Sequence, residues 1–280
     1  MSAALSLRGG ALVLKSISLF LANSRAKSSS PSSSRKTKSP PKSKSKKMQE
    51  AKDAKNKITP KLFDQIKKDT HFNKMEIESL YKIHQQLVAM DRNKPHSDRS
   101  SGAGGAIHKS LHHQGINRNV FCELLHNTFG IVTEDILTDR IFAVWDFESS
   151  GVITLKEWFQ GLSVFLKGTL HEQIEMCFAI YDVNSDGYIT KEEMFILLRN
   201  CLIKHPQDED PDEGVKELVE IVLKKIDVDA DGKVSKLDFQ ETVEKEPLLL
   251  QAFGPCLPTK SAAETFLATL KVQYGGDNKN

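Results

Sequence analysis

A twelve-residue pattern that occurs twice constrains this chain more than any other feature. Residues 182–193 read DVNSDGYITKEE, and residues 227–238 read DVDADGKVSKLD. Each stretch places side-chain oxygens at positions one, three and five, a glycine at position six and a carboxylate at position twelve. Calcium-binding helix–loop–helix units, the EF-hands, need this spacing because several oxygens must surround one ion while the glycine makes a sharp turn. The pattern predicts an all-α protein built from EF-hands.

Loop 182–193 meets every requirement of a calcium site. The expected ligands are the side-chain oxygens of Asp182, Asn184, Asp186 and Glu193, together with the backbone carbonyl of Tyr188. Glu193 is expected to contribute both of its oxygens. The sequence therefore predicts that this loop binds Ca²⁺.

Loop 227–238 departs from the pattern at its last position. Asp227, Asp229 and Asp231 are ideal ligands, and Lys233 offers its carbonyl, but Asp238 stands where a glutamate is usual. Aspartate is one carbon shorter and is expected to contribute one oxygen instead of two, which leaves about six ligands, close to the octahedron that Mg²⁺ demands. We expect this loop to bind Ca²⁺ with Mg²⁺ competing.

A third stretch, DFESSGVITLKE at residues 146–157, is a weaker candidate metal site. Its possible ligands are Asp146, Glu148, Ser150, the carbonyl of Val152, and Glu157. Glu148 is one methylene longer than the usual aspartate, and Ser150 is neutral, so the attraction for a hard cation is reduced. A weak metal site and a purely structural loop are both compatible with this sequence.

Apolar residues at helical spacing flank all three loops. The expected buried stripes contain Leu137, Ile141, Phe142, Trp158, Leu162, Phe165 and Leu166 around the first loop, Ile174, Phe178, Tyr181, Met194, Leu197 and Leu198 around the second, and Leu218, Ile221, Val222, Phe239 and Val243 around the third. Thr169 and Glu172 form a capping-box sequence that predicts a helix start.

EF-hands normally pair through a short two-stranded contact at loop position eight. Ile189 and Val234 are expected to meet in this way, whereas Ile153 needs a partner further upstream. Residues 72–87 and 115–125 have the apolar spacing of an entering and an exiting helix, and Ile116 is the candidate partner. No carboxylate ladder lies between these segments. We therefore predict a degenerate first hand at 71–128 that carries an insertion at 91–114.

These features predict two lobes of paired hands. The amino-terminal lobe is expected at 58–168, with its second hand at 134–168. The carboxy-terminal lobe is expected at 169–258, with hands at 169–204 and 214–247. Residues 259–280 are expected to form a final helix, capped by Ser261 and Glu264, and a tail.

The charge distribution separates residues 1–57 from the rest. They hold 14 Lys and Arg against 2 Asp and Glu, and the remaining residues hold 25 against 35. A basic, disordered extension before an acidic body suits a metal-binding domain with an electrostatic tether better than a nucleic-acid-binding protein. An acidic surface such as a tubulin tail is a candidate contact. Residues 11–22 also have some character of a targeting signal, and no segment is apolar enough to cross a membrane.

Three longer stretches resemble known families. Residues 157–194, EWFQGLSVFLKGTLHEQIEMCFAIYDVNSDGYITKEEM, are similar to the neuronal-calcium-sensor superfamily, in which a dead first hand precedes working ones. Residues 209–233 and 248–258 resemble the calaxin family, whose members are associated with outer dynein arms in motile cilia. The resemblance implies a cytoplasmic calcium sensor of the ciliary or flagellar axoneme. Its partners would be outer-arm dynein or the docking complex on doublet microtubules.

The expected mechanism is the opening of a partner groove. With Ca²⁺ bound, Glu193 is expected to move inward, turn the following helix and expose Phe178, Met194, Leu197 and Leu198 to an amphipathic partner helix. Two alternatives stay open: a calcium buffer, and a regulatory subunit of another target such as a phosphatase or a channel. Since no nucleophile or phosphate-binding loop is recognisable, we do not expect an enzyme.

Overall fold

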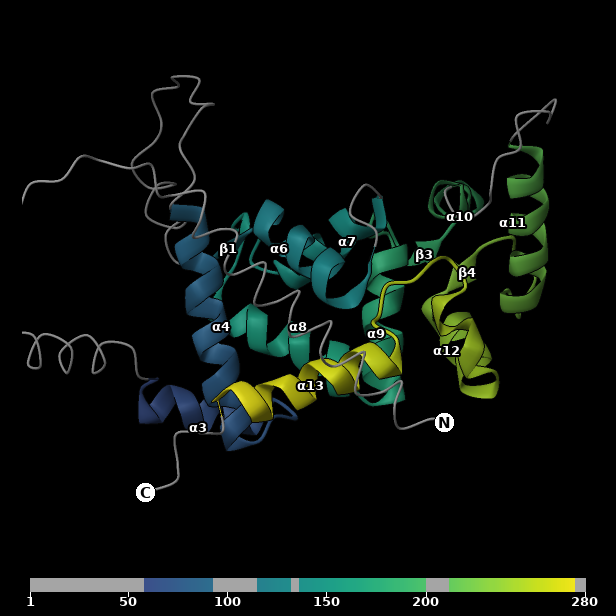
Figure 1. Ribbon diagram of the computed structural model, residues 1–280. Coiled ribbons are helices and arrows are strands. Elements are labelled where there is room, and N and C mark those ends of the chain that lie inside the picture. Colours follow the sequence, from purple (N-terminus) through teal and green to yellow (C-terminus); the bar gives the residue numbers. More distant parts are fainter. Residues whose placement is uncertain (1–57, 93–114, 132–135, 200–211, 275–280) are drawn as a thin grey trace, which may run out of the picture.

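The computed structural model describes residues 58–92, 115–131, 136–199 and 212–274 (Figure 1). The predictions for the extension at 1–57, for nearly all of the insertion at 91–114 and for the end of the tail lie outside these residues. Within them the protein has an all-α EF-hand fold, with two short strand pairs as its only extended contacts.

The amino-terminal half contains the degenerate hand and the hand around loop 146–157. A short helix that the sequence analysis did not predict, α3, precedes them. The elements are α3 (Pro60–Asp69), α4 (Lys74–Arg92), β1 (Ile116–Asn117), α6 (Arg118–Leu124), the π-helical turn η1 (Leu125–Phe129), α7 (Ile136–Trp145), β2 (Val152–Ile153) and α8 (Leu155–Lys167).

The carboxy-terminal half contains the hands around loops 182–193 and 227–238. Its α11 and α12 lie at the far end of the molecule from α4 (Figure 1). The elements are α9 (Leu170–Tyr181), β3 (Tyr188–Ile189), α10 (Lys191–Leu198), α11 (Glu213–Ile226), β4 (Val234–Ser235), α12 (Lys236–Lys245), the 3₁₀ turn η2 (Pro247–Gln251) and α13 (Lys260–Tyr274).

The hands pair as the sequence predicts. Ile116 lies opposite Ile153 in the antiparallel pair β1–β2, and Ile189 lies opposite Val234 in the pair β3–β4. All four side chains are fully buried. Each pair fixes two loops back to back, so the degenerate hand supports loop 146–157 although it has no calcium-loop sequence of its own.

Capping boxes begin several of the helices. The Asn73 side chain accepts a hydrogen bond from the Glu76 amide at the start of α4, and Glu76 accepts one from the Asn73 amide. Thr169 and Glu172 make the predicted capping box at α9. Such boxes satisfy amides that a helix start otherwise leaves unpaired. Loop position twelve takes part in the boxes of α8, α10 and α12, which joins metal-site chemistry to helix geometry.

Most of the predicted stripes form the core, but on α11 the prediction is wrong for Ile221. Ile221 is 66% exposed, and Leu218 and Val222 are only partly buried. The buried side chains of this helix are Val215, Val219, Leu223 and Ile226. Apolar residues are so frequent in α11 that two overlapping stripes fit the helical period, and only packing against the neighbouring elements decides between them.

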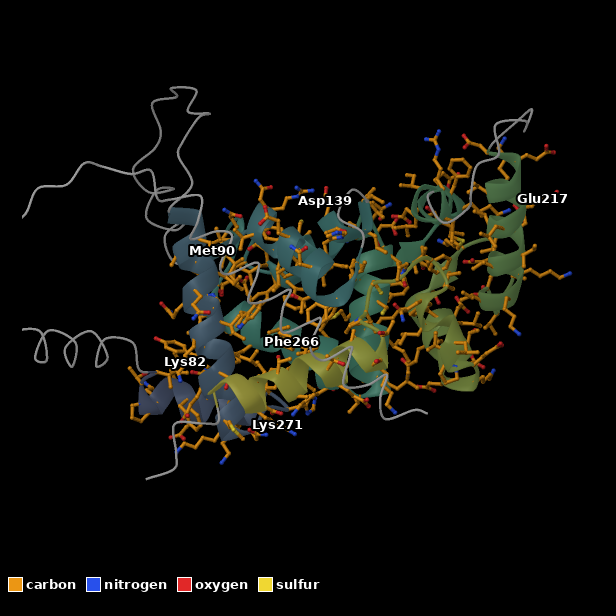
Figure 2. All side chains as sticks on the ribbon, in the orientation of Figure 1. Lys82, Met90, Asp139, Glu217, Phe266 and Lys271 are labelled. Atoms are coloured by element: carbon orange, nitrogen blue, oxygen red, sulfur yellow. The ribbon has the colours of Figure 1, made fainter. Side chains whose placement is uncertain are left out.

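The final helix packs on the amino-terminal half. Its start differs from the prediction: Thr259 precedes the helix, and the Thr259 hydroxyl accepts a hydrogen bond from the Ala262 amide, so Ser261 lies inside the first turn. α13, which carries Phe266 (Figure 2), contacts α4 and η1. The ring centroids of Phe266 and Phe129 are 5.3 Å apart. The last helix of the chain thus completes the core of the first lobe. None of the helices in the described ranges is long and apolar enough to span a membrane.

Candidate metal centre

The three loops share one backbone conformation, including the loop that departs most from the calcium pattern. Position four has a positive φ in each loop, 51° at Ser149, 60° at Ser185 and 60° at Ala230. The glycine at position six also has a positive φ in each, between 78° and 91°. Position four carries no glycine, so no residue type signals this strained turn in advance. The conformation brings the odd-numbered positions around a common centre.

The carboxylate at position one organises each loop in the same way. In loop 182–193, Asp182 Oδ1 accepts a hydrogen bond from the Asp186 amide at 3.1 Å, and Oδ2 accepts one from the Gly187 amide at 2.9 Å. The corresponding pairs of bonds form at Asp146 and at Asp227. These amides hold the carboxylate in place, so the first ligand is positioned by the loop itself.

Position twelve distinguishes the two glutamate loops from the aspartate loop. Glu193 Oε1 accepts a hydrogen bond from the Asn184 amide at 3.0 Å, and Glu157 Oε1 accepts one from the Glu148 amide at 3.1 Å. Both glutamates thus reach across the loop to position three. In the described loop 227–238, no such bond joins Asp238 to the Asp229 amide; Asp238 instead accepts hydrogen bonds from the Ser235 amide and hydroxyl. The shorter side chain stays at its own helix start.

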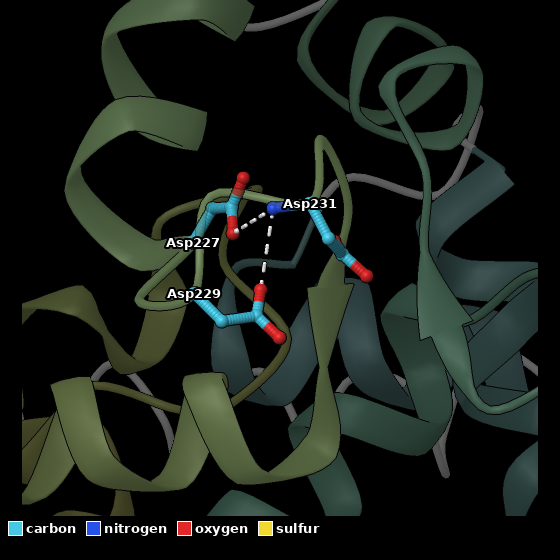
Figure 3. A group of neighbouring side chains, drawn as sticks. All are labelled: Asp227, Asp229 and Asp231. Atoms are coloured by element: carbon cyan, nitrogen blue, oxygen red, sulfur yellow. Dashed lines mark hydrogen bonds between the residues drawn. The ribbon is translucent and has the colours of Figure 1, made fainter.

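Loop 227–238 brings its carboxylates together most closely. One oxygen from each of Asp227, Asp229 and Asp231 lies within 4.8 Å of the others, a grouping of three that no other part of the described chain offers (Figure 3). Oxygens on opposite sides of a Ca²⁺ ion are about 4.6–5.2 Å apart. Desolvation raises the pKa of Asp229, and the negative charges of Asp231 and Asp238 raise it further. A divalent cation would relieve this repulsion, so the residues present fit such an ion.

Loop 182–193 has the fuller set of ligand types but a neutral amide at position three. Asn184 donates a hydrogen bond from its side chain to Asp186 Oδ2 at 3.0 Å. Asp182 and Glu193 are both buried, at 6% and 5% exposure, whereas Asp186 is exposed. Buried carboxylates are expected to be paired or to coordinate metal. The donor set of this loop therefore also fits Ca²⁺.

Loop 146–157 satisfies its own oxygens internally. The Ser150 hydroxyl lies 3.1 Å from Asp146 Oδ1 and 2.9 Å from the Val152 carbonyl oxygen. Those two oxygens occupy ligand positions one and seven. Because a serine can donate its hydrogen to either of them, position five bridges the loop without any ion. This arrangement favours the structural role of the two that the sequence left open.

The two loops of the carboxy-terminal half contact each other at position seven. The Lys233 Nζ atom lies 3.5 Å from the centroid of the Tyr188 ring, and Tyr188 pairs with Ser235 between β3 and β4. Both residues offer their carbonyls as expected ligands. A change in one loop is therefore transmitted to the other through a direct contact as well as through the strands.

The predicted partner-groove residues lie in the core. Phe178, Met194, Leu197 and Leu198 are exposed by 6%, 0%, 2% and 2%. Phe178 packs against Phe239 of α12, with ring centroids 6.0 Å apart. A partner helix can reach Met194, Leu197 and Leu198 only if α10, which carries them, moves away from its neighbours.

Comparison with known proteins identifies the same fold and a specific family. A sequence model of the EF-hand domain pair matches residues 171–244, which include both carboxy-terminal loops. Calaxin of Xenopus laevis is 48% identical over 196 residues, covering 70% of this chain and 86% of that protein. Human calaxin is 44% identical over 209 residues, covering 74% of this chain and 91% of that protein. Calcineurin B of Candida glabrata is 28% identical over 185 residues, covering 66% of this chain and 89% of that protein.

The identity to calaxins extends over most of their length. The calcineurin B similarity is weaker and covers a comparable span. This chain belongs to the calaxin family of EF-hand proteins.

Proposed function

We propose that this protein is a calcium sensor that regulates outer-arm dynein in motile cilia and flagella. The observation that carries the proposal is the pair of loops 182–193 and 227–238. Their first carboxylates are held in place by loop amides, and β3 and β4 join them back to back. Asp182, Asn184, Asp186, Tyr188 and Glu193 would hold one ion. Asp227, Asp229, Asp231, Lys233 and Asp238 would hold the second.

Glu193 is the side chain through which metal binding reaches the fold. When bound, Ca²⁺ supplies a positive charge that the loop oxygens share. Glu193 now accepts hydrogen bonds from the Asn184 and Thr190 amides. To act as a ligand with both oxygens, Glu193 would have to turn a free lone pair of each oxygen toward the ion. Because Glu193 lies in the first turn of α10, that helix would move with it and expose Met194, Leu197 and Leu198.

Membership of the calaxin family supports the ciliary part of the proposal. The partner would be outer-arm dynein or a docking-complex protein in the axoneme, bound through an amphipathic helix that enters the opened groove. The basic extension at 1–57 is a candidate tether to acidic tubulin tails. These assignments describe a regulatory protein.

A second candidate function follows from the similarity to calcineurin B. In that case the same groove would take a helix of a phosphatase. Both candidates require the same loops and the same movement of α10. They differ only in the partner.

The test is affinity capture from isolated axonemes with and without Ca²⁺, using the wild type beside Glu193→Gln. We expect calcium-dependent capture of dynein-arm components by the wild type and its loss in the variant, together with calcium-dependent binding of a hydrophobic dye. Dye binding that does not respond to Ca²⁺ would identify a buffer. A dye response with capture of a phosphatase and no axonemal protein would favour the second candidate.

A further inference from the structure

Arg140 joins the two lobes at the point where loop 182–193 begins. This side chain comes from α7 in the amino-terminal lobe. It donates hydrogen bonds through Nη2 to the carbonyls of Ala179 at 2.8 Å and Asp182 at 2.7 Å, and through Nε to the carbonyl of Ile180 at 3.2 Å. These carbonyls lie in the last turn of α9 and at its C-cap. Arg140 lies about forty residues from them in sequence, so no linear pattern indicates the contact.

A helix end explains why an arginine is effective here. The last carbonyls of an α-helix have no partner within the helix, and the helix dipole concentrates negative charge there. A guanidinium group is planar and permanently charged, and can bond several carbonyls at once. Partial burial lowers the pKa of Arg140, and the nearby charges of Asp182 and Glu193 act in the opposite direction. The group is therefore a charged cap that one lobe supplies to the other.

The same contact fixes the first ligand residue. The carbonyl of Asp182 is held by Arg140, while its carboxylate is held by the Asp186 and Gly187 amides. Asp182 is thus anchored to the amino-terminal lobe on one side and to the metal loop on the other. α7 also contacts both helices of this hand, the entering helix α9 and the exiting helix α10.

Arg140 adds hydrogen bonds to a joint that packing also holds. α7 packs directly against α9, and Arg140 lies in the wall of an open groove of about 480 Å³ between the lobes, which Val144, Phe147, Phe178 and Lys236 also line. At the end of α9, beside this groove, Arg140 bonds three carbonyls. Removing these bonds would weaken the attachment of that end of α9 to α7.

We propose that Arg140 is the positioning residue that couples the metal state of loop 182–193 to the amino-terminal lobe. It holds α9 against α7, so that the displacement of α10 occurs relative to α7 and is felt in the first lobe. This inference rests on the proposed function, since it requires metal binding at 182–193. It also identifies the contact through which the first lobe would respond to that binding. In the loop of the first lobe, Ser150 bridges two of the candidate ligand oxygens.

The two tryptophans of the chain provide the readout. Trp145 ends α7 and Trp158 lies in α8, so both report on the amino-terminal lobe, and both are buried. The experiment uses the full chain in a Glu157→Gln background, which weakens loop 146–157 as a direct source of signal. Ca²⁺ binding is measured by titration calorimetry, and tryptophan emission is followed in the same titration. Adding Glu193→Gln must abolish the emission change if the signal arises at 182–193.

The decisive variant is Arg140→Met, with Arg118→Met as the matched control. Arg118 lies in α6 and forms an exposed ion pair with Asp139 of α7, the helix that also carries Arg140. We expect Arg140→Met to bind Ca²⁺ but to lose most of the emission change, whereas Arg118→Met keeps it. Arg140→Lys retains the charge without the planar fork and is expected to lose most of the change as well. It replaces the methionine variant if circular dichroism shows that the latter does not fold.

The outcomes separate the two proposals. An undiminished emission change in a calcium-binding Arg140 variant overturns the inference. So does a background protein that binds Ca²⁺ at 182–193 without any change in emission, although the proposed sensor function would survive if the hydrophobic dye still responds. Absence of Ca²⁺ binding at 182–193 in the background protein would overturn the proposed function itself, and the inference with it.

Discussion

The side chains at position twelve of the two carboxy-terminal loops differ in length by one methylene group. Glu193 spans its loop to the Asn184 amide, whereas Asp238 is held at Ser235. We expect Asp238→Glu to raise the Ca²⁺ affinity of loop 227–238 by roughly tenfold and to weaken Mg²⁺ competition, because the longer side chain can supply a second oxygen. Titration calorimetry with and without Mg²⁺ measures both effects. The reverse change, Glu193→Asp, is the matched control and should lower Ca²⁺ affinity; an Asp238→Glu protein with unchanged affinities would contradict the argument.

A second prediction at the scale of single residues concerns pH. His84 in α4 is 1% exposed, and neither ring nitrogen has a hydrogen-bond partner in the described structure. Burial lowers its pKa from 6.5 to about 4, although the Ile153 backbone offsets part of the shift. The unfolded chain therefore binds a proton at a higher pH than the folded one. Stability from the neutral ring is complete above pH 6.5 and is lost as the pH falls toward 4, by about 3 kcal/mol in all.

Substitution isolates this contribution from that of the many carboxylates. His84→Leu should show a smaller loss of unfolding free energy between pH 7 and pH 4.5 than the wild type, measured by urea denaturation in calcium-free buffer. His171→Gln, which replaces an exposed histidine, is the matched control. Identical pH slopes for wild type and His84→Leu would show that the ring is not the source.

These residues also mark the reach of sequence analysis. The expected ligands of loops 182–193 and 227–238 follow from spacing within twelve residues and stay predictions. The strand partners, which were also predicted from loop positions, are confirmed. The unpaired nitrogens of His84 and the cap made by Arg140 depend on helices that meet across the fold. Ser150 is intermediate: its neutrality was visible in the sequence, but its two hydrogen-bonding positions required the folded loop.

At the scale of elements, α11 shows why the buried face of an apolar-rich helix cannot be predicted from periodicity alone. Its buried side chains are fixed by contacts with α10 and α12, and its sequence fits a second stripe almost as well. We expect Leu223→Ala, at 5% exposure, to cost about 3 kcal/mol of unfolding free energy. Ile221→Ala should change it by less than about 0.5 kcal/mol, since its side chain is already in solvent.

Urea denaturation of the two variants in calcium-free buffer measures the difference. Both substitutions introduce alanine, so the helix propensity of the new residue is the same and only the burial of the lost side chain differs. Equal destabilisation by the two variants would indicate that both side chains are buried. A larger loss for Ile221→Ala would indicate that the face of α11 with Ile221, and not the face with Leu223, packs on the core.

At the scale of the whole molecule, the helix that follows the carboxy-terminal hands packs on the amino-terminal lobe. This helix, α13, lies against α4 and η1, so it joins the two lobes in addition to the Arg140 contact. The sequence predicted a final helix, and its side chains Phe266 and Leu270 are buried. The sequence did not indicate which lobe this helix covers, because that depends on contacts between distant parts of the chain. The main contacts of α13 therefore do not involve the side of α9 and α10 that is proposed to open.

Because α13 packs on α4 and η1, a substitution in its buried face should lower stability without changing metal binding. Phe266 is 1% exposed and packs on Phe129 of the first lobe. We expect Phe266→Ala to lower the unfolding free energy of the amino-terminal lobe, followed by tryptophan emission, by about 4 kcal/mol. Ca²⁺ affinity at 182–193 should stay within about twofold, since the main contacts of α13 are with α4 and η1 and not with α7, which carries Arg140. Lys271→Ala, at an exposed position of the same helix, should change neither quantity. If Phe266→Ala instead weakened calcium binding as strongly as Glu193→Gln, α13 would have to act on the carboxy-terminal loops, and its assignment to the core of the first lobe alone would be wrong.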